Sequence, residues 1–219
     1  MKIGIDPEDL AGVEGFEDVK VSDRIYVTIG IGNRKIGWIP SWSLPPKKTC
    51  NPRCLKYCGT RCYTNKIEEL HPGVIEAYRH NLWMLNEHPV LAELLIRKFL
   101  VSALPRVMRL HVAGDFFSRE YLNMWCRIAQ ETPETVFYAY SKMDFIDHDR
   151  LPPNLRILRS MWPGMPAPKQ KHVSRNCWMQ DGTEHRIPGD GLVHCCGDCP
   201  KCGFKCAFGD TDVVIDYHR

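Results

Sequence analysis

Long apolar runs and a strong net charge are both missing from this sequence. Residues 91–101 are interrupted by Glu93, Arg97 and Lys98, so this stretch is too polar to cross a bilayer. The first residues lack the apolar segment of a secretory signal, and we therefore expect a cytoplasmic protein without a membrane role. The formal net charge of +3 is too small to indicate a nucleic-acid partner, although it does not exclude one.

The length and composition are those of an ordinary globular protein. A chain of 219 residues with 44% hydrophobic and 25% charged residues can build one sizeable core but is short for two. We expect a single domain, with an N-terminal arm over 1–24, an α/β core over 25–163 and an irregular cysteine-rich tail over 164–219 that packs on the core. Eleven cysteines without a secretory signal favour metal ligands over disulfides.

Four of the cysteines recur at every fourth position, at Cys50, Cys54, Cys58 and Cys62. A core helix has no use for four thiols on one stripe, whereas a metal ion or an iron–sulfur cluster does. In one straight helix the first and last would lie about 18 Å apart, too far for one centre. Pro52 and Gly59 also oppose a continuous helix. We expect a loop or a broken helix in which some of these thiols share one centre.

A second cysteine group lies in the tail, at Cys196, Cys199, Cys202 and Cys206. The spacing CxxCxxCxxxC is that of ferredoxins, although Ala207 replaces the usual proline. It predicts a 4Fe–4S cluster, one or two in number, and Cys206 could serve a centre that it shares with the first group. Zinc is the alternative, because four thiolates in two short pairs also suit a tetrahedral site. His194 and Cys195 are candidates for substituting a ligand.

The middle of the chain alternates between β-rich and helical patterns. Two β-rich runs flank Gly32–Asn33, which predicts a hairpin. Helices are predicted from Pro72, from Pro89 and after Ser118, a good N-cap residue. Strands are predicted at residues 107–112, 135–142, 156–161 and 213–215. Strands that alternate with helices indicate βαβ units and a parallel sheet.

Side chains that end two of these strands are candidates for a ligand site. If Met108, Leu110 and Val112 face the helices, Arg109 and His111 point inward. Gly114 and Asp115 would then lie at the carboxyl end of this strand, and Lys142 would end the next strand at the same edge. In α/β folds that edge carries ligand sites. A sheet with a polar outer face is the alternative reading.

Several stretches also resemble a known family. They are Lys35-Ile-Gly-Trp-Ile-Pro40, Cys58-Gly-Thr-Arg-Cys-Tyr63, Arg109-Leu-His-Val-Ala-Gly-Asp-Phe116 and Phe137-Tyr-Ala-Tyr-Ser-Lys142. From about Asn33 onward the chain resembles the phage gene-product-eighty-eight family, whose function is largely undescribed. The resemblance implies a phage-encoded protein that works in the host cytoplasm.

More distantly, the chain resembles radical S-adenosylmethionine enzymes. That resemblance implies a partial (β/α) barrel with a cysteine loop after its first strand. It also implies that Ala113, Gly114 and Asp115 contact the methionine part of S-adenosylmethionine. The cysteine loop of those enzymes reads CxxxCxxC, whereas this chain has CxxxCxxxC, and Tyr63 follows the last cysteine instead of an aromatic residue preceding it.

Three functions follow from these patterns. The first is an iron–sulfur protein in redox or radical chemistry, with a redox partner or a small-molecule substrate and with His111, Asp115 and Lys142 lining the mouth. The second is a zinc-stapled protein that binds a host partner or nucleic acid, for which Lys47–Lys48 and Lys169–His172 offer slight basic support. The third is a ferredoxin-like electron carrier without a substrate pocket.

Overall fold

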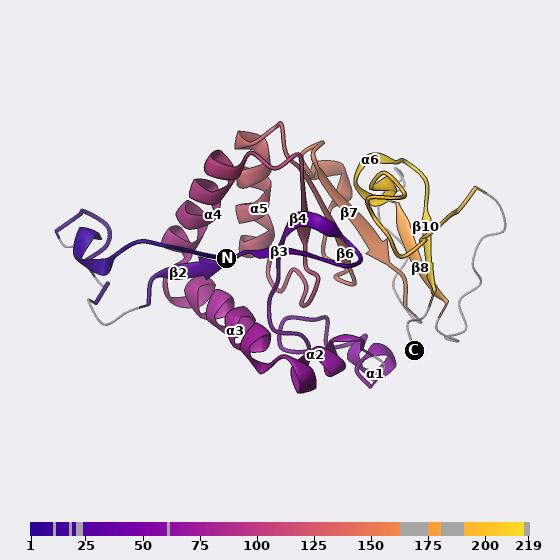
Figure 1. The fold of residues 1–219 in the computed structure, drawn as a ribbon, viewed down its shortest axis with the longest axis horizontal. Helices are drawn as coiled ribbons and strands as arrows, with labels where there is room; N and C mark the ends of the chain where they lie inside the picture. The colour runs from indigo at the N-terminus through magenta and orange to yellow at the C-terminus, as the bar shows by residue number, and fades with distance from the viewer. Residues whose placement is uncertain are drawn as a thin grey trace.

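The computed structural model describes residues 1–10, 12–17, 19–20, 24–60, 62–162, 175–180 and 191–216. Within them the chain forms a mixed α/β fold around a large, mostly parallel sheet (Figure 1). In spatial order its strands are β3 (Gly30–Asn33), β4 (Gly37–Trp42), β5 (Val107–Leu110), β6 (Val136–Ser141), β7 (Leu155–Ser160), β8 (Asn176–Gln180), β10 (Val213–Asp216) and β9 (Val193–His194). Only the β3–β4 pair is antiparallel.

The described helices are α1 (Leu55–Cys58), α2 (Thr64–Leu70), α3 (Pro72–Glu87), α4 (Pro89–Ala103), α5 (Arg119–Glu131) and α6 (Lys205–Phe208), with short 3-10 turns at Pro7–Leu10 and His148–Arg150. The predicted helix starts are confirmed. Pro72 and Pro89 occupy first-turn positions, and the Ser118 hydroxyl accepts a 3.1 Å hydrogen bond from the N–H of Tyr121. Among the described helices, none has the length and apolar character needed to cross a membrane.

The predicted hairpin is present as β3 and β4, but its turn follows Gly32–Asn33 and does not contain these two residues. The Asn33 carboxamide oxygen accepts hydrogen bonds from the N–H groups of Lys35 (2.9 Å) and Ile36 (3.0 Å), which closes the turn. Gly32 has φ +65°, and a Cβ there would overlap the carbonyl oxygen of Gly37. Glycine is therefore required inside the strand rather than in the turn.

The N-terminal arm is not loose at its start. Residues Lys2–Gly4 form β1, which pairs antiparallel with β2 (Tyr26–Thr28) in a separate two-stranded sheet. The terminal ammonium of Met1 donates a 2.8 Å hydrogen bond to the carbonyl of Ile29. Leu10 is buried in the main core.

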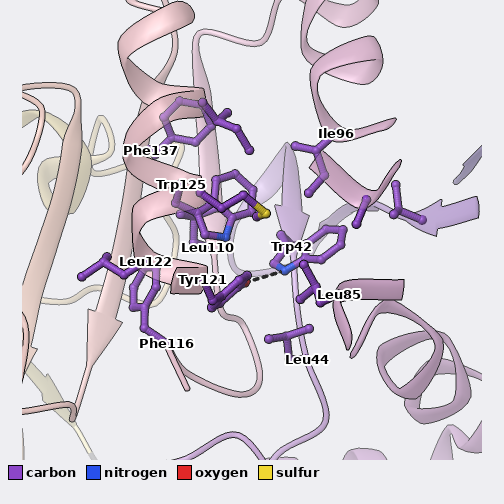
Figure 2. Packing of buried hydrophobic residues seen from close by; sticks show 14 of the residues in the cluster. Trp42, Leu44, Leu85, Ile96, Leu110, Phe116, Tyr121, Leu122, Trp125 and Phe137 are labelled. Atoms are coloured by element: carbon purple, nitrogen blue, oxygen red, sulfur yellow. Dashed lines mark hydrogen bonds between the residues drawn. The ribbon is translucent and has the colours of Figure 1, made fainter. Parts of the chain in front are cut away.

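Helices α3, α4 and α5 cover the face of the sheet that we call the outer face (Figure 1). Met108, Leu110 and Phe137 point into this layer and are fully buried. Trp42 and Trp125 meet edge to face there, with ring centroids 6.0 Å apart, and the Trp42 indole N–H donates a 2.8 Å hydrogen bond to the Tyr121 hydroxyl (Figure 2).

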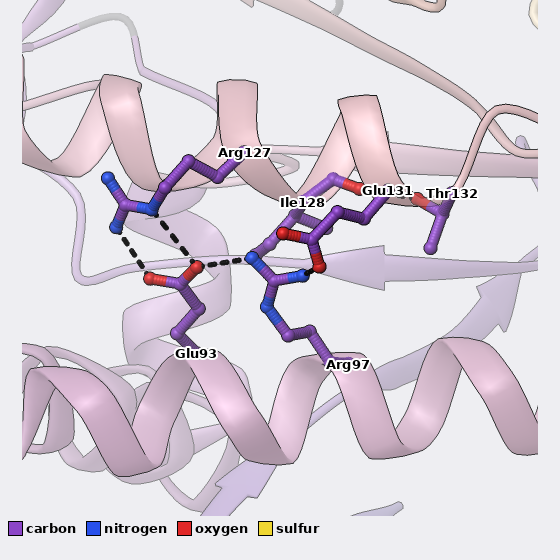
Figure 3. Close-up of polar contacts among 6 residues, drawn as sticks. All are labelled: Glu93, Arg97, Arg127, Ile128, Glu131 and Thr132. Atoms are coloured by element: carbon purple, nitrogen blue, oxygen red, sulfur yellow. Dashed lines mark hydrogen bonds and ion pairs between the residues drawn. The ribbon is translucent and has the colours of Figure 1, made fainter.

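A charged network joins α4 to α5 across this layer (Figure 3). The Glu93 carboxylate accepts hydrogen bonds of 2.6 Å from both Arg97 and Arg127, and Arg97 also pairs with Glu131. Glu93 lies on α4, whereas Arg127 and Glu131 lie on α5, so the network fixes the register between the two helices.

The tail is more regular than the sequence predicts. Its described residues, 175–180 and 191–216, add β8, β9 and β10 to the sheet and place α6 on the opposite, inner face. There Cys206 and Ala207 pack against Val107, Tyr138 and Leu158 in a second apolar cluster. The predicted strand at 213–215 is confirmed as β10. The expectation of an irregular tail is wrong for these residues, because β8 and β10 pair in parallel register with each other and β8 pairs with β7.

Candidate functional site

The first cysteine group follows β4 after a connecting segment, residues 43–49, at the carboxyl edge of the parallel strands. The chain passes over the end of β5, where the N–H of Leu44 donates a 3.0 Å hydrogen bond to the carbonyl of Ala113. Gly114 (φ +80°) lies so close to Leu44 and Thr49 that a Cβ would come within 2.6–2.9 Å of them. Ala113 and Gly114 therefore fix the position of the segment that leads to the cysteines.

Two further contacts tie this segment to the end of β6. The side-chain amide of Asn51 donates a 2.9 Å hydrogen bond to the carbonyl of Lys142. Arg53 forms an ion pair with Asp144. The segment itself is a broken helix, α1 followed by α2, as the proline and the glycine predict. Its four thiols are thereby held beside the carboxyl ends of β5 and β6.

Asp115 is buried, and its carboxylate is the hydrogen-bond acceptor for three neighbouring donors. Its carboxylate accepts hydrogen bonds from the Ser141 hydroxyl (2.6 Å) and from the N–H groups of Phe116 and Lys142 (both 2.8 Å). Burial raises the pKa of Asp115, and these hydrogen bonds offset the rise only in part. The carboxylate joins the ends of β5 and β6, so it is a positioning group in this structure.

The thiols of Cys54 and Cys58 form a close pair in the first group. Their sulfur atoms lie 3.9 Å apart, and Cys54 is buried while Cys58 is half-buried. Cys62 hydrogen-bonds the Thr64 hydroxyl at 2.8 Å. Burial and the nearby charge of Asp115 raise the pKa of Cys50 to about 12. Cys50 therefore stays protonated until a cation replaces its proton.

Lys142 supplies the cation of this site. Its ammonium donates a 2.9 Å hydrogen bond to the Ser160 hydroxyl. Burial alone would lower the pKa of Lys142, but the electrostatic influence of Cys58 and then of Cys54 raises it. In return, the Cys54 thiol and then the Lys142 ammonium lower the pKa of Cys58 to about 6 against the effect of burial. The mouth can thus hold one thiolate at neutral pH.

His111 does not point inward. It follows β5 with φ +56°, which breaks the strand alternation, and its Nε2 lies 2.9 Å from the Tyr121 hydroxyl on the helix side. Burial and the charge of Arg109 lower its pKa to about 3, so the ring is neutral. The expectation that it lines the mouth beside Asp115 and Lys142 is wrong, because the positive φ turns the side chain over.

Arg109 does point to the inner face. Its guanidinium lies over the rings of Tyr140 and Tyr138, at 4.4 Å and 5.1 Å from their centroids. Because side chains alternate along the strand, these tyrosines share the inner face with Lys142. The alternating pattern of residues 135–142 in the sequence could have indicated this. No motif in the sequence marks either tyrosine as part of a site.

The tail thiols gather around these tyrosines. The Tyr140 hydroxyl donates a 2.7 Å hydrogen bond to the sulfur of Cys206, and Cys199 and Cys206 are buried. Cys196 is exposed, whereas Cys195 and Cys177 pack on the inner cluster. In Figure 1, α1 lies below and α6 above, at opposite ends of the strands, so the structure does not bring the two thiol groups together in one site.

The donor chemistry of both groups fits a thiophilic metal. Within the described ranges, no three His, Cys, Asp or Glu side chains already surround a common point as metal ligands do. A metal would therefore have to draw the thiols together. Of the two basic segments, Lys47 is paired with Glu68 at 2.9 Å, and residues 169–172 lie outside the described part of the chain.

A hollow that the structure describes lies elsewhere. It has a volume of about 660 Å³ and is mostly apolar, lined by residues that include Trp38, Phe99, Phe204 and Arg106. None of the candidate residues at the carboxyl edge lines it. It therefore offers no substrate pocket for the thiols of the first group.

Comparison with known proteins identifies a family. The family model described as gene product 88 matches residues 23–188. The gene 88 proteins of Mycobacterium phages L5 and D29 are each 28% identical over 145 residues, which cover 61% of this chain and 60% of the relative. The match thus spans less than two thirds of those relatives. No solved structure matches the chain. Because the family model covers most of the sequence, this chain belongs to the gene product 88 family.

Proposed function

We propose that this protein binds an iron–sulfur cluster through Cys50, Cys54, Cys58 and Cys62 and takes part in redox or radical chemistry. The proposal is carried by one observation: a broken helix holds these four thiols at the carboxyl edge of the parallel strands. That edge is where α/β folds carry their ligands. Lys142 adds a positive charge beside Cys54 and Cys58, which suits a negatively charged thiolate centre.

The chain's own residues support the site in distinct ways. Asp115 and Asn51 hold the edge and the cysteine segment to the end of β6. Lys142 favours the thiolate form of Cys58, the form that ligates metal. A bound cluster would supply electron transfer, and its partner would be a redox protein or a small molecule.

We further propose a fold like that of radical S-adenosylmethionine enzymes, with S-adenosylmethionine as the cofactor. The position of the cysteine segment, after the first strand of the parallel series, agrees with that fold. Gly114 and Asp115 are engaged by Thr49 and Ser141, however. Binding of this cofactor to residues 113–115 would require these contacts to open.

Zinc is a second candidate for the same thiols, and one distance favours it. Two thiolates on a tetrahedral zinc, with Zn–S bonds of about 2.3 Å, lie about 3.8 Å apart. Cys54 and Cys58 already have a separation of 3.9 Å. Zinc would make this a structural site that cross-links the cysteine segment beneath the edge of the sheet.

Anaerobic purification of the full chain tests these proposals. A brown protein with iron and acid-labile sulfide supports the cluster, zinc alone supports the structural zinc site, and absence of both metals rejects the two. Cys58→Ala and Cys62→Ala should each lose the first-group metal and destabilise the fold, whereas Cys126→Ala should retain it. Full retention by the first two variants refutes the ligand assignment. Formation of 5′-deoxyadenosine after addition of S-adenosylmethionine and a reductant would separate an enzyme from an electron carrier.

A further inference from the structure

The loop at 199–204 is fastened to the hairpin turn. The N–H of Cys199 donates a 2.8 Å hydrogen bond to the carbonyl of Lys35, and the ring of Pro200 lies against Gly37. The loop closes on itself, because the N–H of Phe204 donates to the carbonyl of Cys199 at 2.9 Å. The thiol of Cys202 also points back to that carbonyl, at 3.3 Å. Cys199 and Cys202 are thus held in one short turn.

The adjacent cysteines 195 and 196 lie in different environments. The N–H of Cys195 donates a 2.8 Å hydrogen bond to the carbonyl of Val214, which extends the β9 pairing by one residue. Its side chain packs on the inner cluster that contains Cys206. Cys196 is exposed, and its thiol donates to the carbonyl of Asp198 at 3.1 Å. The backbone therefore directs Cys195, and not Cys196, toward the other tail thiols.

Two tyrosines of β6 face these thiols. Tyr140 donates to the sulfur of Cys206 at 2.7 Å. Tyr138 is only 1% exposed, and its hydroxyl has no hydrogen-bond partner in the described part of the chain. It lies beside Cys199. A buried hydroxyl without a partner costs about 1–3 kcal/mol, so this group points to an acceptor that a thiolate would supply.

Arg109 adds a charge that lacks a counter-ion. Its guanidinium is stacked on the rings of Tyr138 and Tyr140. Its described neighbours that alter its pKa are tyrosines, and it forms no ion pair with a described carboxylate. Arg109 is half-buried, so its charge is only partly solvated. Four thiolates around a divalent ion carry a net charge of about −2 and would compensate it.

We propose that Cys195, Cys199, Cys202 and Cys206 form a second, separate thiolate centre for zinc or iron on the inner face of the sheet, and that Cys196 is not a ligand. The centre goes beyond the site proposed at the carboxyl edge and needs none of its thiols. Binding of one divalent ion replaces four S–H bonds by four metal–sulfur bonds and releases four protons to solvent, without electron transfer. Tyr138 and Tyr140 then donate hydrogen bonds to ligand sulfurs.

The test uses the full chain with Cys54→Ala and Cys58→Ala, which disables the carboxyl-edge site. In this background Cys195→Ser and Cys196→Ser are compared as a matched pair. Metal content is measured after anaerobic purification, and Zn²⁺ and Co²⁺ are then titrated into metal-free protein. We expect the Cys196→Ser protein to hold one equivalent and the Cys195→Ser protein to bind at least tenfold more weakly. Zinc, or iron with or without sulfide, in the purified protein identifies the native metal.

Equal binding by both variants overturns the proposal, as does loss of metal from Cys196→Ser alone. If the background itself holds no metal and binds none, the second centre is refuted while the carboxyl-edge site still stands. If Cys195→Ser does not fold, thiol alkylation of the chain without substitutions replaces this measurement. Added Zn²⁺ should then protect the half-exposed Cys195 and Cys202, whereas Cys196 and the half-buried Cys126 should react equally with and without metal. Protection of Cys196 instead of Cys195 also overturns the assignment.

Discussion

The carboxylate of Asp115 accepts a 2.8 Å hydrogen bond from the backbone N–H of Lys142, and this bond joins the ends of β5 and β6. Lys142 in turn accepts a hydrogen bond at its carbonyl from Asn51 in the cysteine segment. The buried carboxylate is thus linked through one residue to the thiols. The geometry of the carboxyl edge depends on polar contacts as well as on apolar packing.

Replacing Asp115 by alanine should destabilise the protein by about 2–4 kcal/mol, because three buried donors lose their acceptor. Urea unfolding followed by circular dichroism measures the change. Asp149→Ala is the matched control, since Asp149 is exposed, and should stay within about 0.5 kcal/mol of the unaltered protein. Equal stability of the two variants would show that this carboxylate does not hold the edge.

Gly114→Ala should cost about 2–4 kcal/mol and weaken metal binding by the first cysteine group. The new Cβ would require φ +80° from alanine and would come within 2.6 Å of the Thr49 hydroxyl and 2.9 Å of the Leu44 carbonyl. Thermal unfolding and metal content are the measurements.

Gly73→Ala provides the opposite control. A Cβ at Gly73 meets no atom within 4 Å, and the residue lies in the first turn of α3. This variant should be stabilised by about 0.5–1 kcal/mol. Destabilisation at Gly73 as large as at Gly114 would contradict the steric argument.

The Glu93 network should make stability depend on acid pH. Burial by itself raises the pKa of Glu93, but hydrogen bonds and charges from Arg127 and Arg97 hold it below its ordinary value of 4.5. A lowered pKa in the folded state stabilises the protein above pH 4.5, and this stabilisation is lost as the pH falls through the folded value.

Glu93→Gln should therefore lower the free energy of unfolding by about 1–2 kcal/mol at pH 7, and by less at acid pH. Urea unfolding at several pH values measures the difference between the two proteins. Arg150→Gln, in an exposed pair with Asp147, should change stability by no more than about 0.5 kcal/mol. A pH-independent difference for Glu93→Gln would reject the electrostatic origin.

Lys142→Met should raise the pKa of Cys58 in the metal-free protein. Without the ammonium the thiolate loses a favourable charge, so alkylation by iodoacetamide should require a higher pH than in the unaltered protein. Mass spectrometry of the alkylated peptides gives the midpoint for each thiol. Cys126, whose pKa is raised by burial, is the internal control and should not shift between the two proteins.

Much of the core could be predicted because its signals are local. Proline at the first turn, serine at the N-cap and alternation along 135–142 each act within a few residues, and the structure confirms the elements they indicate. The broken helix of the first cysteine group follows from Pro52 and Gly59 in the same way.

The remaining features depend on contacts between distant residues. The direction of His111 is set by a positive φ and by Tyr121, which no spacing rule reports. The inward direction of Cys195 follows from pairing with Val214, nineteen residues further along the chain. The ferredoxin-type spacing therefore selected Cys196, the neighbour that the fold exposes.

The placement of α6 and β10 has a consequence for biosynthesis. Tyr138, Tyr140 and Arg109 are all translated long before the residues that cover them, since α6 begins at Lys205 and β10 at Val213. A nascent chain on the ribosome must carry that side of the sheet uncovered until the residues of α6 and β10 have emerged. The inner face, and any metal centre on it, can therefore form only once residues 205–216 have been made.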